Sequence, residues 1–193
     1  MTDLEIVSME TVAAFLERGL TIGTAESLTG GMIAAALADV SGASGTLMGG
    51  IVSYDSRIKH DLLGVPKSVI NDPGVVSEIC ARLMAEGARA RLKVDVAVSA
   101  TGIAGPTGGT EQTPVGTVFI GVSTCKGTKV DECHFEGDRL AVRRQAAEHA
   151  LRMALQAAQD GLAPAQHTAP SGWKVVAENV LDFVIDAARE IID

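Results

Sequence analysis

The sequence predicts an α/β protein in which helices cover both faces of a mixed β-sheet. Patterns typical of helices and of strands alternate first along the chain, and two strands joined by a short turn follow them. Hydrophobic residues make up 47% of the 193 residues, whereas aromatic residues make up only 3%. The core must therefore consist of aliphatic side chains and closely packed alanine and glycine, which favours a layered α/β protein. A nearly continuous apolar run over residues 94–101 predicts a strand buried on both faces.

The remaining elements follow from apolar periodicity and from residues that start or stop helices. Helical patterns end before Gly19 and at Gly64, since glycine commonly follows the last turn of a helix. Ser77 and Asp138 are expected to cap the helices that follow them. The expected helices span residues 3–18, 29–40, 56–64, 78–92 and 139–159. The expected strands span residues 20–25, 46–55, 94–101, 115–124 and 128–137, with turns or loops at 65–74 and 102–114.

Charge and cysteine content exclude several classes of function. With a formal net charge of −8, the chain lacks the basic surface that non-specific binding to nucleic acid requires. Three cysteines without Cys-x-x-Cys spacing suggest neither a disulfide framework nor a zinc site. The acidic N-terminal segment lacks the apolar core of a signal peptide, and no apolar run approaches the ~18 residues of a membrane span. We therefore expect a cytoplasmic protein without membrane or nucleic-acid partners.

The chain divides into one domain and an appended C-terminal segment. We expect the domain to span residues 1–160, because a single domain commonly holds about 100–150 residues. Residues 161–172 have the Pro, Ala and Gly content of a linker. Residues 173–193 carry apolar residues at helical spacing. This last segment is expected to form a helix that packs on its own domain or on a second subunit.

The stretch from residue 23 to residue 37 places Ser27 where a strand turns into a helix. A serine at this corner can be a simple helix cap, because its hydroxyl accepts a hydrogen bond from an amide of the first turn. The same corner suits a nucleophile, because the amides of Thr29, Gly30 and Gly31 can point at an oxyanion or a phosphate. Nothing around the four histidines marks a Ser-His-Asp set, so a nucleophilic Ser27 requires a different base.

Lys59 is the candidate base, in a short helix that follows the second expected strand, and Tyr54 lies at the end of that strand. A lysine is most often a solvated surface charge, and it acts as a base only if burial or a neighbouring positive charge lowers its pKa. Ser56 and Lys59 also match the Ser-x-x-Lys motif of β-lactamases. The companion motifs of those enzymes are absent from the sequence, so we reject that assignment.

Two further features are consistent with a ligand site. The loop at residues 100–109 follows a buried strand and contains glycines and prolines that let backbone approach a ligand, although it has no Walker A or dinucleotide-binding pattern. Arg139 and Arg143 lie one helical turn apart and can share a face. This spacing fits a solvated helix start as well as it fits an anion clamp.

Five blocks of the sequence occur together, in order, in one protein family. The blocks are Ala25–Gly31, Gly49–Val65, Val98–Gly109, Pro114–Val122 and Phe135–Arg143. Over roughly residues 8–158 the chain closely resembles the CinA C-terminal domain family, whose members include nicotinamide-nucleotide amidases. The resemblance implies a three-layer α/β/α sandwich with a mixed, mostly parallel sheet. It also implies hydrolysis of the carboxamide of nicotinamide mononucleotide to nicotinate mononucleotide and ammonia, in pyridine-nucleotide recycling.

The resemblance also assigns roles to residues. The family's serine, lysine and tyrosine fall on Ser27, Lys59 and Tyr54, which implies a nucleophile, a base and a residue that orients groups or relays protons. Neither a metal nor another cofactor is implied, and a homo-oligomer, dimer or larger, is expected. The residues expected to bind the mononucleotide and its phosphate are Thr29, Gly30, Gly31, Thr101, Gly102 and Arg143.

The chain departs from the family pattern at three positions. Leu28 replaces the usual cysteine, and Asp55 and Ser56 replace the usual serine and asparagine that follow the tyrosine. These departures leave open a second hypothesis, in which the domain is a catalytically weak module that binds a nucleotide or a partner in competence or in the response to DNA damage. Some relatives carry an additional N-terminal nucleotide-processing domain, for which this chain has no room, so we expect the stand-alone form.

Overall fold

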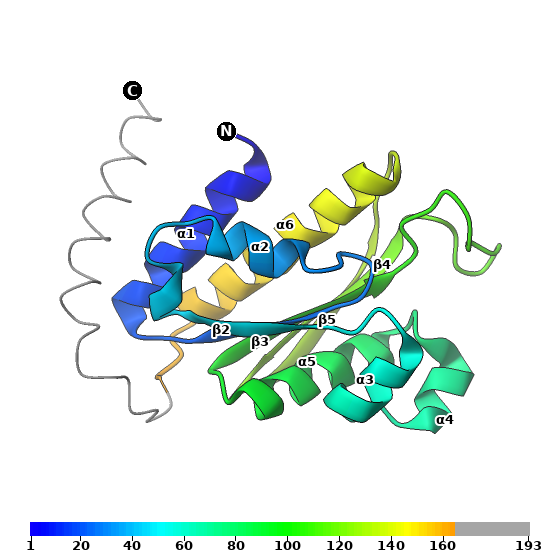
Figure 1. The fold of residues 1–193 in the computed structure, drawn as a ribbon, viewed down its shortest axis with the longest axis horizontal. Coiled ribbons are helices and arrows are strands. Elements are labelled where there is room, and N and C mark those ends of the chain that lie inside the picture. Colours follow the sequence, from blue (N-terminus) through cyan, green and yellow to red (C-terminus); the bar gives the residue numbers. More distant parts are fainter. Residues whose placement is uncertain (165–193) are drawn as a thin grey trace.

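A five-stranded mixed sheet forms the centre of the molecule (Figure 1), and the structure, a computed structural model, describes residues 1–164. The strands are β1 (Ile22–Glu26), β2 (Leu47–Val52), β3 (Val96–Gly102), β4 (Thr117–Thr124) and β5 (Gly127–His134), in the spatial order β2-β1-β3-β4-β5. β1 pairs in parallel with β2 and β3, whereas β4 pairs antiparallel with β3 and β5. All strands except β4 therefore run in the same direction, and the prediction of a mixed, mostly parallel sheet is confirmed.

Helices cover both faces of this sheet, so the molecule has the predicted three layers (Figure 1). One face carries α1 (Asp3–Arg18), α2 (Met32–Ala38) and α6 (Arg139–Gln159). The other face carries α3 (Ser56–Leu63), α4 (Lys67–Val69), the turn η2 (Ile70–Gly74) and α5 (Glu78–Leu92), while the turn η1 (Ala43–Gly45) leads into β2. The predicted helix ends are also confirmed, because Gly19 and Gly64 adopt left-handed C-caps and the side chains of Ser77 and Asp138 accept hydrogen bonds from first-turn amides.

Two clusters of buried side chains join the layers. The larger cluster packs α1, α2 and α6 against the sheet, and the smaller one packs α5 and its neighbours against the opposite face. Strand β3 contributes to both, because successive side chains of a strand point to opposite faces. Val96 and Val98 belong to the larger cluster, and Ala97 belongs to the smaller. The prediction of a strand buried on both faces is confirmed.

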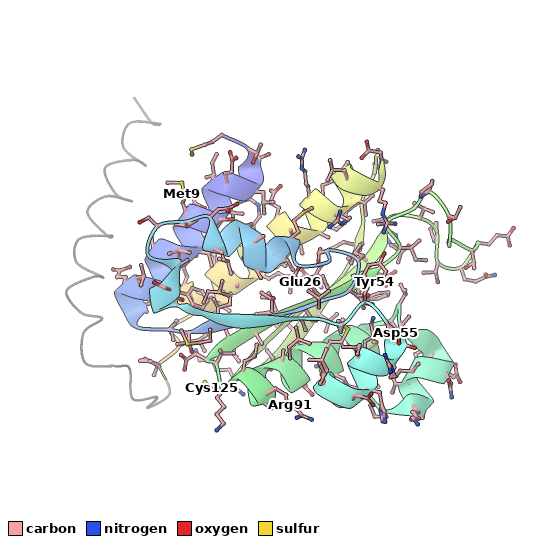
Figure 2. The ribbon with its side chains drawn as sticks, in the orientation of Figure 1. Met9, Glu26, Tyr54, Asp55, Arg91 and Cys125 are labelled. Atoms are coloured by element: carbon pink, nitrogen blue, oxygen red, sulfur yellow. The ribbon has the colours of Figure 1, made fainter. Side chains whose placement is uncertain are left out.

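The parallel strands bring three loops to one end of the sheet. β1 leads into the turn at Ser27, β2 leads into Tyr54, and β3 leads into the glycine-rich loop at residues 103–116. Figure 2 shows Tyr54 and Asp55 at this end, and Cys125 at the opposite end in the turn between β4 and β5. The crevice beyond the carboxyl ends of parallel strands is where α/β proteins commonly bind ligands.

Observed and expected boundaries differ at several places. β2 ends at Val52 rather than at residue 55, because Asp55 already serves as the N-cap of α3. The segment at 65–74, expected as turns, contains the helical turns α4 and η2. Leu162 is 8% exposed and joins the larger core cluster, so the first part of the expected linker packs on the domain.

The rest of the expected linker and the expected helix at residues 173–193 lie outside the described residues. Within residues 1–164, none of the helices combines the length and the apolar character needed to cross a membrane.

Candidate active site

Ser27 and Lys59 meet at the carboxyl ends of β1 and β2. The Nζ atom of Lys59 lies 2.9 Å from the Oγ atom of Ser27. Ser27 is the first residue after β1, and Lys59 lies near the start of α3. The lysine is only 1% exposed, whereas Ser27 is half-buried and both residues line one pocket. The candidate nucleophile and the candidate base are therefore in direct contact.

Three oxygen atoms surround Nζ of Lys59. They are the carbonyl oxygen of Ser53 at 2.5 Å, the carbonyl oxygen of Tyr54 at 3.4 Å and Oγ of Ser27 at 2.9 Å. The two carbonyl oxygens only accept hydrogen bonds, whereas a serine hydroxyl can also donate one. A neutral amine at this position gives its two N–H groups to the carbonyls and directs its lone pair at Ser27. A proton can therefore pass between Oγ and Nζ while the other contacts stay in place.

Burial lowers the pKa of Lys59 from its ordinary value of 10.5, because the charged ammonium group loses its hydration. The negative charge of Asp55 acts in the opposite direction and raises this pKa, as does a negative charge on Cys80 where its thiol is ionised. Burial also raises the pKa of the Cys80 thiol to about 11, so this thiol carries no charge at neutral pH. Within the described residues, Lys59 forms no ion pair. A buried lysine of this kind is suited to act as a general base.

Glu26, the residue before Ser27, occupies the N-terminal end of α2. Its side chain is fully buried, and Figure 2 shows it at the end of β1. A carboxylate at this position satisfies amides that have no partner within the helix and compensates the positive end of the helix dipole. The groups that donate to it, at distances of 2.9 to 3.0 Å, are the hydroxyl of Thr24 and the amides of Gly31, Ile33 and Ala34.

The amides of Gly30 and Gly31, which were expected to face a substrate, therefore already have acceptors within the domain. The Gly31 amide is bonded to Glu26, and the Gly30 amide donates to the carbonyl oxygen of Ser27 at 3.1 Å. The amides of Leu28 and Thr29, in contrast, have no acceptor within residues 1–164. These two groups are the remaining backbone donors in the turn that follows the nucleophile.

The Arg143 side chain is bonded to the turn that follows Ser27 and does not line the pocket. Its Nε donates to the carbonyl oxygen of Leu28 at 3.0 Å, and its Nη2 donates to that of Thr29 at 2.7 Å. Neither Arg143 nor Thr29 lines the pocket, and the buried hydroxyl of Thr29 has no partner among the described residues. The Arg143 guanidinium group, which was expected to bind the substrate, is bonded instead to the interior of the turn. The Thr29 amide, the group of Thr29 that was expected to face the substrate, has no acceptor within residues 1–164.

A pocket of about 260 Å³ opens beside Ser27 and Lys59. Thr101 and Gly102, both expected in the substrate site, form part of its wall. The Thr101 hydroxyl donates to the carbonyl oxygen of Val75 at 2.6 Å, which fixes the side chain against the residue that follows η2. A Cβ atom on Gly102 would lie 2.5 Å from the carbonyl oxygen of Thr117, so the wall requires glycine here.

Tyr54 lies at the rim of the pocket, where 60% of the residue is exposed. Its hydroxyl accepts a hydrogen bond of 2.7 Å from Nη2 of Arg139, and no hydrogen bond joins it to Ser27 or Lys59 in the described structure. Nη1 of Arg139 donates to the carbonyl oxygen of Gly105 at 2.8 Å. The family resemblance implies Arg143, rather than Arg139, as the substrate-binding arginine. The position of Arg139 at the first residue of α6, beside the glycine-rich loop, is the signal that favours it.

Two larger hollows lie elsewhere, one of about 690 Å³ along α1 and one of about 530 Å³ beside β5. Neither contains the Ser27 and Lys59 pair. In the part of the chain that the structure describes, no three His, Cys, Asp or Glu side chains are grouped so that they could hold a metal ion.

Residues 5–158 match the CinA C-terminal domain family. The chain belongs to this family. It is 48% identical over 155 residues to a CinA-like protein of Syntrophus aciditrophicus (strain SB), a match that covers 79% of this chain and 37% of the relative. The chain thus spans little more than a third of the length of that CinA-like relative.

Solved structures of CinA relatives have the same fold. The competence/damage inducible protein CihA from Agrobacterium tumefaciens is 36% identical, with a TM-score of 0.79 over 82% of this chain and 97% of that chain. A CinA superfamily protein from Klebsiella pneumoniae 700603 is 29% identical, with a TM-score of 0.79 over 83% of this chain and 100% of that chain. The Ser27 and Lys59 pair lies inside the CinA domain, and residues 159–193 lie beyond the matched range.

Proposed function

We propose that this CinA domain is a serine–lysine amidase that converts nicotinamide mononucleotide and water to nicotinate mononucleotide and ammonia. The observation that carries the proposal is the 2.9 Å contact between Ser27 Oγ and the buried Nζ of Lys59. The pKa of Lys59 is lowered by burial, which increases the fraction of neutral amine at physiological pH. A serine paired with such an amine is one of the known forms of an activated nucleophile.

In the first half of the reaction, neutral Lys59 removes the proton of Ser27 as Oγ forms a bond to the carboxamide carbon. The carbonyl electron pair moves onto oxygen and gives a tetrahedral oxyanion. When this intermediate collapses, the C–N bond breaks and the Lys59 ammonium group gives its proton to the departing nitrogen, which leaves as ammonia. In the second half, Lys59 removes a proton from water as the water oxygen forms a bond to the ester carbon. The bond between that carbon and Oγ then breaks, the Lys59 ammonium group returns the proton to Oγ, and the carboxylic acid is released with the Ser27 hydroxyl and neutral Lys59 restored.

The oxyanion requires donors that are already in place, and the amides of Leu28 and Thr29 fit this requirement. They follow the nucleophile directly and have no acceptor within residues 1–164. Arg143 fixes them indirectly, because it binds the carbonyl oxygens of the same two residues. A single oxyanion donor contributes about 3–4 kcal/mol to transition-state stabilisation in other hydrolases.

The substrate class is supported by family membership and by the charge of the pocket. Amidase activity on nicotinamide mononucleotide is associated with CinA proteins, and this chain matches the domain over residues 5–158. Lys59 and Arg139 line the pocket, and none of its described lining residues is Asp or Glu. A negatively charged mononucleotide fits such a pocket better than a neutral or cationic amide does.

Ammonia release from nicotinamide mononucleotide by the purified protein tests the proposal. Ser27→Ala and Lys59→Ala should each lower kcat by about 10³-fold or more, because a nucleophile and its base act as a unit. Ser56→Ala is the matched control, since Ser56 lines the same pocket but is not among the described hydrogen-bond partners of Lys59 Nζ, and it should retain most of the activity.

Two results would contradict the proposal. An inactive Ser56→Ala variant together with an active Ser27→Ala variant would mean that the nucleophile is wrongly assigned. A wild-type protein that binds the mononucleotide but releases no ammonia would favour the hypothesis of a catalytically weak binding module.

A further inference from the structure

Arg139 presents unused hydrogen-bond donors at the rim of the pocket. Its guanidinium group donates to the hydroxyl of Tyr54 at 2.7 Å and to the carbonyl oxygen of Gly105 at 2.8 Å. A guanidinium group carries five N–H donors, so three of them have no acceptor within the described residues. The two bonds come from different segments of the rim and hold the group in one orientation. Arg139 is therefore a preorganised donor rather than a freely rotating surface side chain.

Arg139 has no compensating charge in direct contact within residues 1–164, where it forms no ion pair. The adjacent carboxylate of Asp138 accepts a hydrogen bond of 2.8 Å from the amide of Ala141 and serves as the cap of α6. No Asp or Glu is among the described residues that line the pocket, although the chain as a whole has a net charge of −8. A pocket that lacks described acidic side chains and contains an arginine without an ion pair among the described residues favours the binding of an anion beside that arginine.

The pocket also has two chemically different ends. Lys59 is 1% exposed and lies with Ser27 in the interior, whereas Tyr54, the partner of Arg139, is 60% exposed at the rim. A ligand that reaches both ends places an uncharged carbonyl group at Ser27 and an anionic group at Arg139. We propose that Arg139 forms a subsite for a phosphomonoester group of the substrate, with Tyr54 and Gly105 positioning its guanidinium group. This inference rests on the proposed amidase function and names the residue that sets its substrate class.

Arg143 offers an internal comparison, since it lies one turn further along the same helix and carries the same charge. Its guanidinium group is bonded to the carbonyl oxygens of Leu28 and Thr29, behind the Ser27 turn, and it does not line the pocket. Arg143 is a positioning residue for the nucleophile and the oxyanion donors. Loss of Arg143 should therefore affect substrates with and without a phosphate group equally.

The test compares kcat/KM for nicotinamide mononucleotide and for its riboside, which lacks the phosphate group. Arg139→Gln should lower the ratio of kcat/KM for the mononucleotide to kcat/KM for the riboside by about tenfold or more, because a charge-assisted hydrogen bond to the phosphate is lost. Arg139→Lys should restore part of the ratio, since it retains the charge. Tyr54→Phe removes the hydroxyl that positions the Arg139 guanidinium group but leaves the charge of Arg139. This variant should therefore change the ratio less than Arg139→Gln does. Arg143→Gln should lower both values together and leave the ratio within about twofold.

A binding measurement separates this inference from the amidase proposal. By calorimetry, ribose 5-phosphate should bind the wild-type protein, and Arg139→Gln should weaken this binding by about tenfold or more, while Arg143→Gln should not. If no amide is hydrolysed but this pattern of binding is observed, the amidase proposal fails and the anion subsite stands. If the mononucleotide is hydrolysed but Arg139→Gln lowers both kcat/KM values equally, the subsite is wrong and the amidase proposal stands.

Discussion

The interior and the rim of the candidate site are held in place by different means. In the interior, the Ser27 turn, Lys59 and Glu26 are fixed by short hydrogen bonds to backbone groups from several elements. At the rim, two hydrogen bonds of Arg139 connect Tyr54, α6 and the glycine-rich loop. The difference matches the proposed function, in which a rigid interior would position the reacting groups and a more exposed rim would recognise the rest of the substrate.

The largest difference between the interior and the rim is expected in the free energy of unfolding when Glu26 is substituted. Glu26→Ala would leave the amides of Gly31, Ile33 and Ala34 without the acceptor that they share. Each buried polar group left unsatisfied costs about 1–3 kcal/mol, so the free energy of unfolding should fall by about 3 kcal/mol or more. Urea denaturation measures this change.

Thr107→Ala at the exposed rim is the control for this prediction, and it should change the free energy of unfolding by less than about 0.5 kcal/mol. Equal effects of the two substitutions on the free energy of unfolding would remove the distinction between a rigid, buried interior and a more exposed rim.

A smaller effect is expected on the pH dependence, at Asp55. Lys59 acts as a base only when neutral, so kcat/KM should rise with pH through the pKa of Lys59, which burial places below 10.5. The charge of Asp55 raises that pKa, so Asp55→Asn should lower it and move the rising limb to lower pH by a fraction of a pH unit. Asparagine caps helices as well as aspartate does, so the start of α3 should be retained.

The pH profiles of kcat/KM for the wild-type protein and Asp55→Asn measure this shift. A limb that moves to higher pH, or that does not move, would mean that a group other than Lys59 controls the rate.

Periodicity and capping residues were sufficient to predict the layers of the fold. Strand β3 was predicted because a strand buried on both faces is apolar at nearly every position, and α6 was predicted from its cap at Asp138. Boundaries were less accurate where a side chain acts locally, as at Asp55, whose capping role ends the extended segment early. Such a role depends on the backbone path, which apolar periodicity does not encode.

The candidate site was predicted in part. Ser27 and Lys59 were predicted as nucleophile and base and are in contact. The donors of Gly30, Gly31 and Arg143 were expected to face the substrate. In the structure they are bonded, respectively, to the carbonyl oxygen of Ser27, to the Glu26 carboxylate, and to the carbonyl oxygens of Leu28 and Thr29. Residues one turn apart on a helix have equivalent sequence patterns, and only the tertiary structure shows that Arg139 reaches the pocket while its neighbour reaches the turn.

Lys59 is proposed to be a neutral base beside Ser27, and an NMR titration of lysine side chains labelled with carbon-13 at the ε position tests this proposal most directly. The resonance of Lys59 is identified by its absence from a Lys59→Met variant. The account predicts that this resonance titrates at a pH below the ordinary value of 10.5, because burial lowers the pKa of Lys59. A Lys59 resonance that shows the amine still protonated up to or beyond pH 10.5 would contradict the assignment of Lys59 as the base.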